Sequence, residues 1–327
     1  MKIFRRHLNR QLGARTLWRA DFRPRESLQP PCLTLGYVIL SRLIRSLLLF
    51  SAATAQDFSN IRIERFTTGF LYTEGPVWSE EGFLLYSDVP AGRIWTAVPG
   101  KKPVVYREVS GGAHGNDFDS QGRLFTCEAT ARRVTRTDRR GKIEVIAENW
   151  EGKRLNAPND IVVRRDGHAW FSDPAFGSQA DARELDFYGV YHIPPKGPIE
   201  LVARPQGRPN GLALSANGRM LYVTNADERN VRVYDLDRSG KASGERVLIS
   251  GTAGPANGIC VDEKGSIFVM ATGVQFHAPD GKHLYTAEMP EAPSNCTFGD
   301  EDLMTLYITA RTSIYRIRWD VKGAVQH

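Results

Sequence analysis

A motif of fifteen residues recurs six times along this chain of 327 residues, and it constrains the fold more than any other feature. Each copy begins with a polar residue, after which apolar and polar residues alternate on both sides of a turn. The copies start at positions 74, 114, 159, 210, 257 and 295 and read EGPVWSEEGFLLYSD, HGNDFDSQGRLFTCE, NDIVVRRDGHAWFSD, NGLALSANGRMLYVT, NGICVDEKGSIFVMA and NCTFGDEDLMTLYIT. This alternation has the period of a β-strand, so each copy predicts a strand hairpin.

Glycine marks the turn in five of the six copies. It stands eight residues after the start of the motif, at Gly82, Gly122, Gly167, Gly218 and Gly265. Glycine adopts the positive φ of a tight hairpin turn without steric cost. The sixth copy contains GDEDLMT and predicts a slightly altered turn.

Repeats spaced 38 to 51 residues apart, each with several strands, are typical of β-propeller blades. Six repeats predict an all-β, six-bladed propeller over residues 56–327. The sixth repeat offers only three strands, the last of them SIYRIRW (313–319). The stretch IRIERF (61–66) would supply the fourth, so that strands from the two ends of the propeller pair and close the ring. Two stacked β-sandwiches would also use many strands but would not require one motif at every start.

The excess of basic residues lies outside the repeats. Residues 1–56 contain ten Lys and Arg against two Asp and Glu, which leaves 33 against 35 in the rest. A nearly neutral body offers no cationic surface for phosphates, so we do not expect a nucleic-acid partner.

The segment SRLIRSLLLFSAATAQ (41–56) has the basic region, short apolar run and small-x-small site of a secretory signal peptide. We expect cleavage near Ala55, export to the periplasm or medium, and no membrane span in the mature protein. Residues 1–55 would then be a leader whose true start lies downstream of Met1, for example at Val38. The alternative is a disordered basic tail. Cys127, Cys260 and Cys296 would remain after cleavage, with no zinc-binding spacing and at least one thiol unpaired.

The first residues of the six repeats are predicted to form a ring. The first strand of each propeller blade lines the central channel, so equivalent positions surround the axis. The ring consists of Glu74, His114, Asn159, Asn210, Asn257 and Asn295. Buried polar groups without partners cost about 2–7 kcal/mol each. Oxygen ligands of this kind suit a hard cation, Ca²⁺ first, with Zn²⁺ or Mg²⁺ as alternatives. The other interpretation is a channel of ordered water.

At these residues the sequence resembles the gluconolactonase, senescence-marker-protein and luciferin-regenerating-enzyme family of six-bladed propellers. The resemblance spans about residues 60–323. It is carried by TEGPVWSEEGFLLYSD, CEATARRVTRTD, EGKRLNAPNDIVVRRDGHAWFSDPAFG, RPNGLALSANGRMLYVTNADERNVRVYDLD and LYITARTSIYRIR. It implies a hydrolase that uses a divalent metal ion to open sugar lactones such as gluconolactone.

The resemblance also implies roles for individual residues. Glu74 and Asn210 match metal ligands of the family, and Asn159 matches an asparagine that contacts the metal-bound water and the substrate. Asn257 stands where the family usually has an aspartate that binds the metal and acts as general base. The implied metal set is therefore Glu74, Asn159, Asn210 and Asn257. An amide can still coordinate Ca²⁺, but it cannot accept a proton at neutral pH.

The substitution at position 257 leaves the proton acceptor open. His114 is the most suitable remaining ring member, because a histidine ordinarily titrates near pH 6.5. The alternative is that His114 only donates a hydrogen bond into the channel. The expected catalytic residues are His114, Asn159 and Asn257. Strand alternation predicts that Asp160 points away from the axis and ties down the loop. Asp173 is expected to cap a strand end or turn near the mouth.

Three functions fit this sequence. The first is an exported, calcium-dependent lactonase with a small lactone as its partner. The second keeps the metal site but hydrolyses phosphotriesters or aryl esters. The third is a calcium-stabilised propeller that binds a sugar or a protein without catalysis. Neither the particular lactone nor the oligomeric state follows from the sequence.

Overall fold

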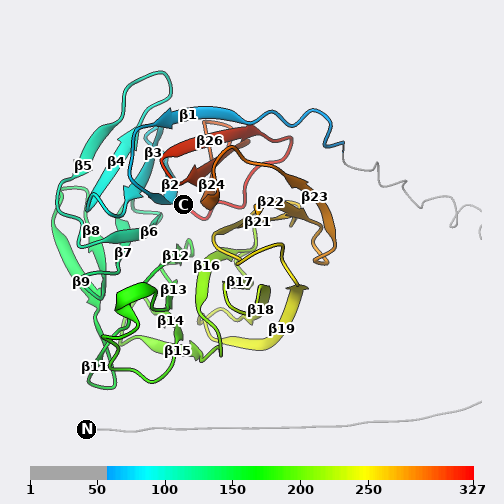
Figure 1. The fold of residues 1–327 in the computed structure, drawn as a ribbon. Coiled ribbons are helices and arrows are strands. Elements are labelled where there is room, and N and C mark those ends of the chain that lie inside the picture. The colour runs from blue at the N-terminus through cyan, green and yellow to red at the C-terminus, as the bar shows by residue number, and fades with distance from the viewer. Residues whose placement is uncertain (1–56) are drawn as a thin grey trace, which may run out of the picture. The chain divides into compact units, whose positions relative to one another are not determined.

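The computed structural model describes residues 57–327, so the proposed signal peptide and its cleavage site near Ala55 lie outside the described residues. Six four-stranded antiparallel sheets surround a central axis (Figure 1). The fold is therefore the six-bladed β-propeller that the repeats predicted. Each motif copy runs along the innermost strand of one blade and into the strand that follows.

The first three blades follow one another along the chain. Blade 1 consists of β2 (Thr73–Ser79), β3 (Phe83–Asp88), β4 (Arg93–Ala97) and β5 (Val104–Arg107). Blade 2 consists of β6 (Ala113–Phe118), β7 (Leu124–Glu128), β8 (Arg133–Thr137) and β9 (Ile143–Ala147). Blade 3 consists of β12 (Ile161–Val163), β13 (Ala169–Asp173), β14 (Gly189–Ile193) and β15 (Glu200–Ala203). A small hairpin, β10 (Asn149–Trp150) with β11 (Lys153–Arg154), precedes blade 3.

The remaining blades complete the ring. Blade 4 consists of β16 (Pro209–Leu214), β17 (Met220–Asn225), β18 (Asn230–Leu236) and β19 (Ala242–Ser250). Blade 5 consists of β20 (Ile259–Val261), β21 (Ile267–Ala271), β22 (Gly273–His277) and β23 (His283–Ala287). Blade 6 consists of β24 (Pro293–Gly299), β25 (Thr305–Ala310), β26 (Ser313–Arg318) and β1 (Glu64–Thr68).

Blade 6 closes the propeller with strands from both ends of the described chain. β1 pairs antiparallel with β26, with Glu64 opposite Arg316 and Thr68 opposite Ser313. The outer strand begins three residues later than the predicted 61–66. Ile61 and Ile63 instead pack against the apolar core between blades 5 and 6, which explains why that stretch looked like a strand.

The hairpin turns match the prediction from glycine. All five marker glycines have positive φ, between 63° and 91°. In each turn the glycine N–H donates to the carbonyl three residues earlier, as Gly82 does to Ser79 and Gly218 to Ser215. The sixth turn differs, because Leu303 donates to Asp300 and both residues have positive φ.

Helical structure in residues 57–327 is limited to one 3₁₀ turn, η1 (Gly177–Gln179). None of the helical structure in this range could cross a membrane. The apolar cores lie within and between blades and contain large buried rings, among them Trp170, Tyr86 and Tyr307.

The segment 321–327 crosses one end of the channel and contacts every blade. Figure 1 shows this end of the chain at the centre of the ring. The segment has hydrogen-bond or ion-pair partners from blades 6 to 1 in turn, namely Leu303, Val261, Ser215, Arg165, Asp117 and Trp78. This segment therefore closes one end of the channel, which we call the far end.

Candidate functional site at one end of the channel

The backbone brings the six predicted ring residues together around the axis. The amide of Gly115 donates to the carbonyl of Asn159 at 2.7 Å, and the amide of Gly211 donates to the carbonyl of Asn257 at 3.2 Å. The amide of Gly258 donates to Ser294, the neighbour of Asn295, at 2.8 Å. Adjacent blades are therefore joined at the ring by main-chain hydrogen bonds.

The glycine that follows the ring residue in several repeats lets the backbones of adjacent blades come this close. A Cβ atom on Gly75 would lie 2.0 Å from the carbonyl oxygen of His114, and one on Gly211 would lie 2.6 Å from that of Asn257. One on Gly258 would lie 2.3 Å from the side-chain oxygen of Asn295. No side chain fits at such distances, so these positions require glycine for close packing near the axis.

Hydroxyl groups on the second strands hold the ring carbonyls of the next blade. Ser87 donates to the carbonyl of His114 at 2.8 Å, Ser172 to that of Asn210 at 2.6 Å, and Thr224 to that of Asn257 at 2.5 Å. This role of the hydroxyl groups was not predicted from the sequence. The available signal was a Ser or Thr thirteen or fourteen residues after the first residue of these repeats.

Glu74 supplies the ring's carboxylate and is 5% exposed. Burial, followed by the nearby negative charge of Asp160, raises the pKa of Glu74 to about 8. The amide of Gly75 donates to its carboxylate at 3.1 Å, and the side-chain amides of Asn295 and Asn257 act in the same direction to lower the pKa. Without a positive partner, this carboxyl group is largely protonated at neutral pH.

Asn159 is positioned by the loop that precedes it. Both oxygens of the buried Asp173 carboxylate accept main-chain hydrogen bonds, from Asn156 and Ala157, each at 2.8 Å. Asp173 thus caps the turn that leads into Asn159, as the sequence predicted. The side-chain amide nitrogen of Asn159 lies 3.4 Å from Nδ1 of His114.

His114 shares the site with Asn159, and its imidazole is less basic than the sequence suggested. Burial lowers its pKa to about 4. The ring is therefore neutral at pH 7. Since the Asn159 amide nitrogen is a donor, Nδ1 is the acceptor atom of this imidazole.

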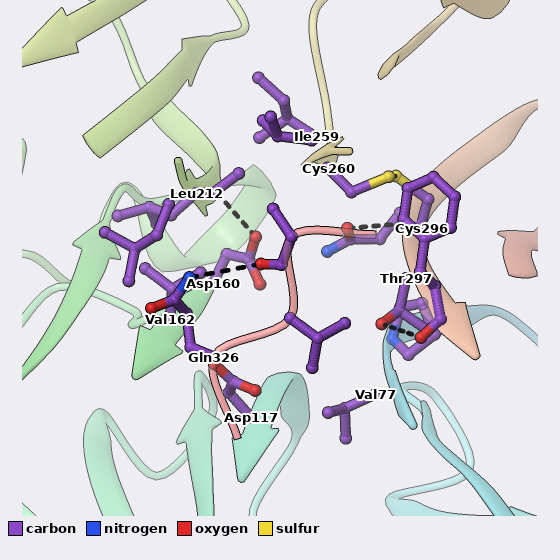
Figure 2. Close-up of a pocket in the computed structure, with 18 of the residues that line it drawn as sticks. Val77, Asp117, Asp160, Val162, Leu212, Ile259, Cys260, Cys296, Thr297 and Gln326 are labelled. Atoms are coloured by element: carbon purple, nitrogen blue, oxygen red, sulfur yellow. Dashed lines mark hydrogen bonds between the residues drawn. The ribbon is translucent and has the colours of Figure 1, made fainter. Parts of the chain in front are cut away.

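The prediction that Asp160 points away from the axis was wrong. The side chain lines the channel, where Oδ2 accepts a hydrogen bond from the amide of Leu212 at 2.9 Å (Figure 2). Burial raises its pKa to about 7, and the repulsion of Asp117 adds to this shift. Asn159 and Asp160 both pair with Ser172 on the neighbouring strand, so a β-bulge breaks the expected alternation at this point.

A cavity continues along the inner strands beyond the ring. Its wall includes Asn116, Asp160, Leu212 and Asn295, and the segment 324–327 closes it (Figure 2). The ring residues Glu74, Asn159, Asn210 and Asn257 do not line this cavity and lie toward the opposite end of the channel. The candidate site therefore has a cavity behind it, with the segment 324–327 on its far side.

The donor set of the ring fits a hard cation. It combines one carboxylate with amide oxygens, and no lysine or arginine is among the main causes of the shifted pKa values of Glu74 and Asp160. Within residues 57–327, no cluster of three or more His, Cys, Asp or Glu side chains is arranged to hold a metal ion. A cation here would depend on the asparagine oxygens, which are ligands that Ca²⁺ accepts.

Comparison with protein families gives a match over residues 72–312 to the family model described as the SMP-30/Gluconolactonase/LRE-like region. The chain is 32% identical to a gluconolactonase from Zymomonas mobilis, over 80% of this chain and 82% of that protein. It is 27% identical to diisopropyl-fluorophosphatase from Loligo vulgaris, over 78% of this chain and 91% of that protein.

A solved structure from Xanthomonas campestris, described as a gluconolactonase, has the same architecture. It superposes with a TM-score of 0.75 at 32% sequence identity and covers 82% of this chain and 92% of its own. The region matched by the family model, residues 72–312, includes all six ring residues.

Proposed function

Since this chain belongs to the SMP-30/Gluconolactonase/LRE-like family, we propose that it is a lactonase that hydrolyses a sugar lactone or related lactone with the help of Ca²⁺. The observation that carries the proposal is the meeting of Glu74, His114 and Asn159 with asparagines of blades 4 to 6 at one end of the channel. A carboxylate, amide oxygens and a neutral imidazole are suited to ester-type hydrolysis at neutral pH.

We propose that Glu74, Asn159, Asn210 and Asn257 hold the cation. When bound, a divalent cation withdraws electrons from the substrate carbonyl and stabilises the negative charge that develops on its oxygen. The protein's part is to keep these oxygens in place. Main-chain hydrogen bonds between blades and the Asp173 cap before Asn159 do this.

We propose that Nδ1 of His114 accepts the proton of the attacking water. Asn257 cannot do so, because a neutral amide has no proton-accepting site at this pH. Nδ1 lies 3.4 Å from the side-chain amide nitrogen of Asn159, beside one of the proposed ligands, and its lone pair becomes available to the water when this long hydrogen bond opens. The low pKa of His114 keeps this lone pair free of a proton at neutral pH, although it also makes the imidazole a weaker base.

A pH-indicator assay tests the proposed activity. Several five- and six-membered sugar lactones are offered to the protein with Ca²⁺ and with EDTA. We expect acid release well above the spontaneous rate, lost with EDTA and restored by excess Ca²⁺. The Glu74→Gln variant, which keeps the shape of the side chain but not its charge, is the matched control and should be inactive. Retained binding of a lactone without turnover would instead support a binding propeller.

Phosphotriesters belong in the same assay, because the similarity to diisopropyl-fluorophosphatase covers most of the chain. Turnover of a fluorophosphate or aryl ester with no turnover of any lactone would show that the proposed substrate class is wrong. The proposed metal site would still stand.

We further propose that the protein is exported, on the basis of residues 41–56. N-terminal sequencing of the protein from its native host tests this. A mature chain that begins near residue 56 is expected, and a chain that retains residues 1–37 would contradict the proposed leader.

A further inference from the structure

Two cysteines from neighbouring blades meet in the channel wall. Cys260 lies on β20 of blade 5 and Cys296 on β24 of blade 6, and their Sγ atoms are 2.7 Å apart (Figure 2). The two residues are 9% and 6% exposed, and neither is bonded to another cysteine in the structure. β20 and β24 belong to different sheets, so the two cysteine side chains meet across the boundary between the blades.

We infer that Cys260 and Cys296 form a disulfide that links blade 5 to blade 6. The two Sγ atoms need to approach by less than about 1 Å to reach the bonding distance of about 2.05 Å, which side-chain rotation can supply. The third cysteine of the described residues, Cys127, is buried in a separate apolar core between blades 2 and 3. The pairing is therefore determined by the fold. This inference goes beyond the proposed lactonase activity and does not depend on it.

The reaction requires an oxidant of the disulfide class, such as oxidised glutathione or an oxidised thiol–disulfide oxidoreductase. Cys260 and Cys296 together lose two protons and two electrons as the Sγ–Sγ bond forms, and the oxidant's disulfide is reduced to two thiols. Burial raises the pKa of the Cys260 thiol, and the thiolate is the reactive form. Oxidation is therefore expected during folding, before the two blades close on each other.

The bond would lie directly behind the candidate site. Cys260 is three residues after Asn257, and Cys296 immediately follows Asn295, whose side-chain oxygen accepts the amide hydrogen of Cys296 at 2.8 Å. A covalent link here fixes the spacing of the last two ring positions. It also restricts the unfolded chain by closing a loop between blades.

Thiol counting tests the inference directly. The full chain is denatured, reduced and refolded in a glutathione buffer with excess oxidised glutathione, then denatured again and alkylated without reductant. We expect two of its four thiols to react with iodoacetamide, against four after reduction. Tryptic mapping should find the peptides 247–264 and 283–311 joined. Four reactive thiols, or a different joined pair, would overturn the inference.

Thermal unfolding supplies a second measurement with matched controls. Reduction of the refolded wild-type protein should lower its unfolding midpoint by roughly 5–10 °C. The Cys127→Ala variant should show the same loss on reduction, and Cys296→Ala should show none, whatever each substitution does to stability on its own. An equal effect of reduction on wild type and Cys296→Ala would overturn the inference.

Discussion

The carboxyl groups of Glu74 and Asp160 lie in the same buried channel, and the side-chain amide of Asn295 acts on both to lower their pKa values. Burial, followed by the charge of Asp160, raises the pKa of Glu74 to about 8. Burial also raises the pKa of Asp160 to about 7. Two carboxyl groups buried in one channel are both ionised at neutral pH only when a cation binds beside them.

Ca²⁺ binding should therefore release protons. At pH 7 Glu74 is mostly protonated and Asp160 partly so, and a cation at the ring favours the ionised form of both. We expect release of about one proton per ion at pH 7 and an affinity that rises up to about tenfold per pH unit below pH 8. Calorimetry in two buffers with different ionisation enthalpies measures the released protons.

The Asp160→Asn variant is the control for proton release. It removes the negative charge beside Glu74, so the pKa of Glu74 should fall and fewer protons should be released at pH 7. Binding heats that are the same in both buffers for the wild-type protein would contradict the expected linkage.

The Asn257→Asp substitution should strengthen the proposed metal site. It adds a second carboxylate to a ring that has one, and the attraction between opposite charges at ligand distance is large in a partly buried site. We expect Ca²⁺ affinity to increase roughly tenfold or more, with a rise in lactone turnover because the new carboxylate can accept a proton. Titration with a calcium-sensitive dye measures the affinity, and an unchanged value would remove Asn257 from the ligand set.

The His114→Ala substitution separates the proposed base from the metal ligands. Loss of a general base typically lowers the rate by a factor of about 10²–10⁴, whereas Ca²⁺ affinity should stay within a few-fold of the wild-type value. Because the pKa of His114 is lowered to about 4, its protonation should reduce the wild-type rate only below about pH 5 when Ca²⁺ is saturating. A variant with unchanged turnover would show that His114 is not the base.

The features that recur from blade to blade were predictable from the sequence, because each stands at the same position in several copies of the motif. The marker glycines of the turns and the polar first residues of the repeats both rest on five or six aligned copies. The placement of Asp160 failed because the alternation rule assumes a regular strand from Asn159 onward. In the structure, strand pairing shifts register next to ring residues, between Glu74 and Val77 in blade 1 and between Pro209 and Leu212 in blade 4.

Contacts that occur only once in the fold could not be predicted. Cys260 and Cys296 stand at different positions of their repeats, so the repeat pattern does not align them. The segment 321–327 has no periodicity that would place it across the channel. Its position depends on a surface that all six blades form together, and no local pattern encodes such a surface.

Substitution of His327 tests whether this segment holds the far end of the channel. The Nε2 atom of His327 donates to the carbonyl of Trp78 at 2.7 Å, and Nδ1 lies 3.6 Å from Oδ1 of Asp117. Burial alone would lower the pKa of His327, but the hydrogen bond to Asp117 and its negative charge outweigh burial, and the pKa is raised. The protonated imidazole is therefore more stable in the folded protein than in the unfolded chain.

A histidine whose pKa is raised in the folded state stabilises the fold fully when the pH is below its ordinary pKa of about 6.5. This stabilisation is lost as the pH rises through the pKa of the folded state. The His327→Ala variant should therefore lose about 1–2 kcal/mol of unfolding free energy at pH 6 and clearly less at pH 9. Chemical denaturation at the two pH values measures the difference. The His327→Gln variant can still donate to Trp78 but carries no charge, so it should reproduce the pH-dependent part of the loss. An equal loss for His327→Ala at both pH values would show that the ion pair with Asp117 does not stabilise the closed end of the channel.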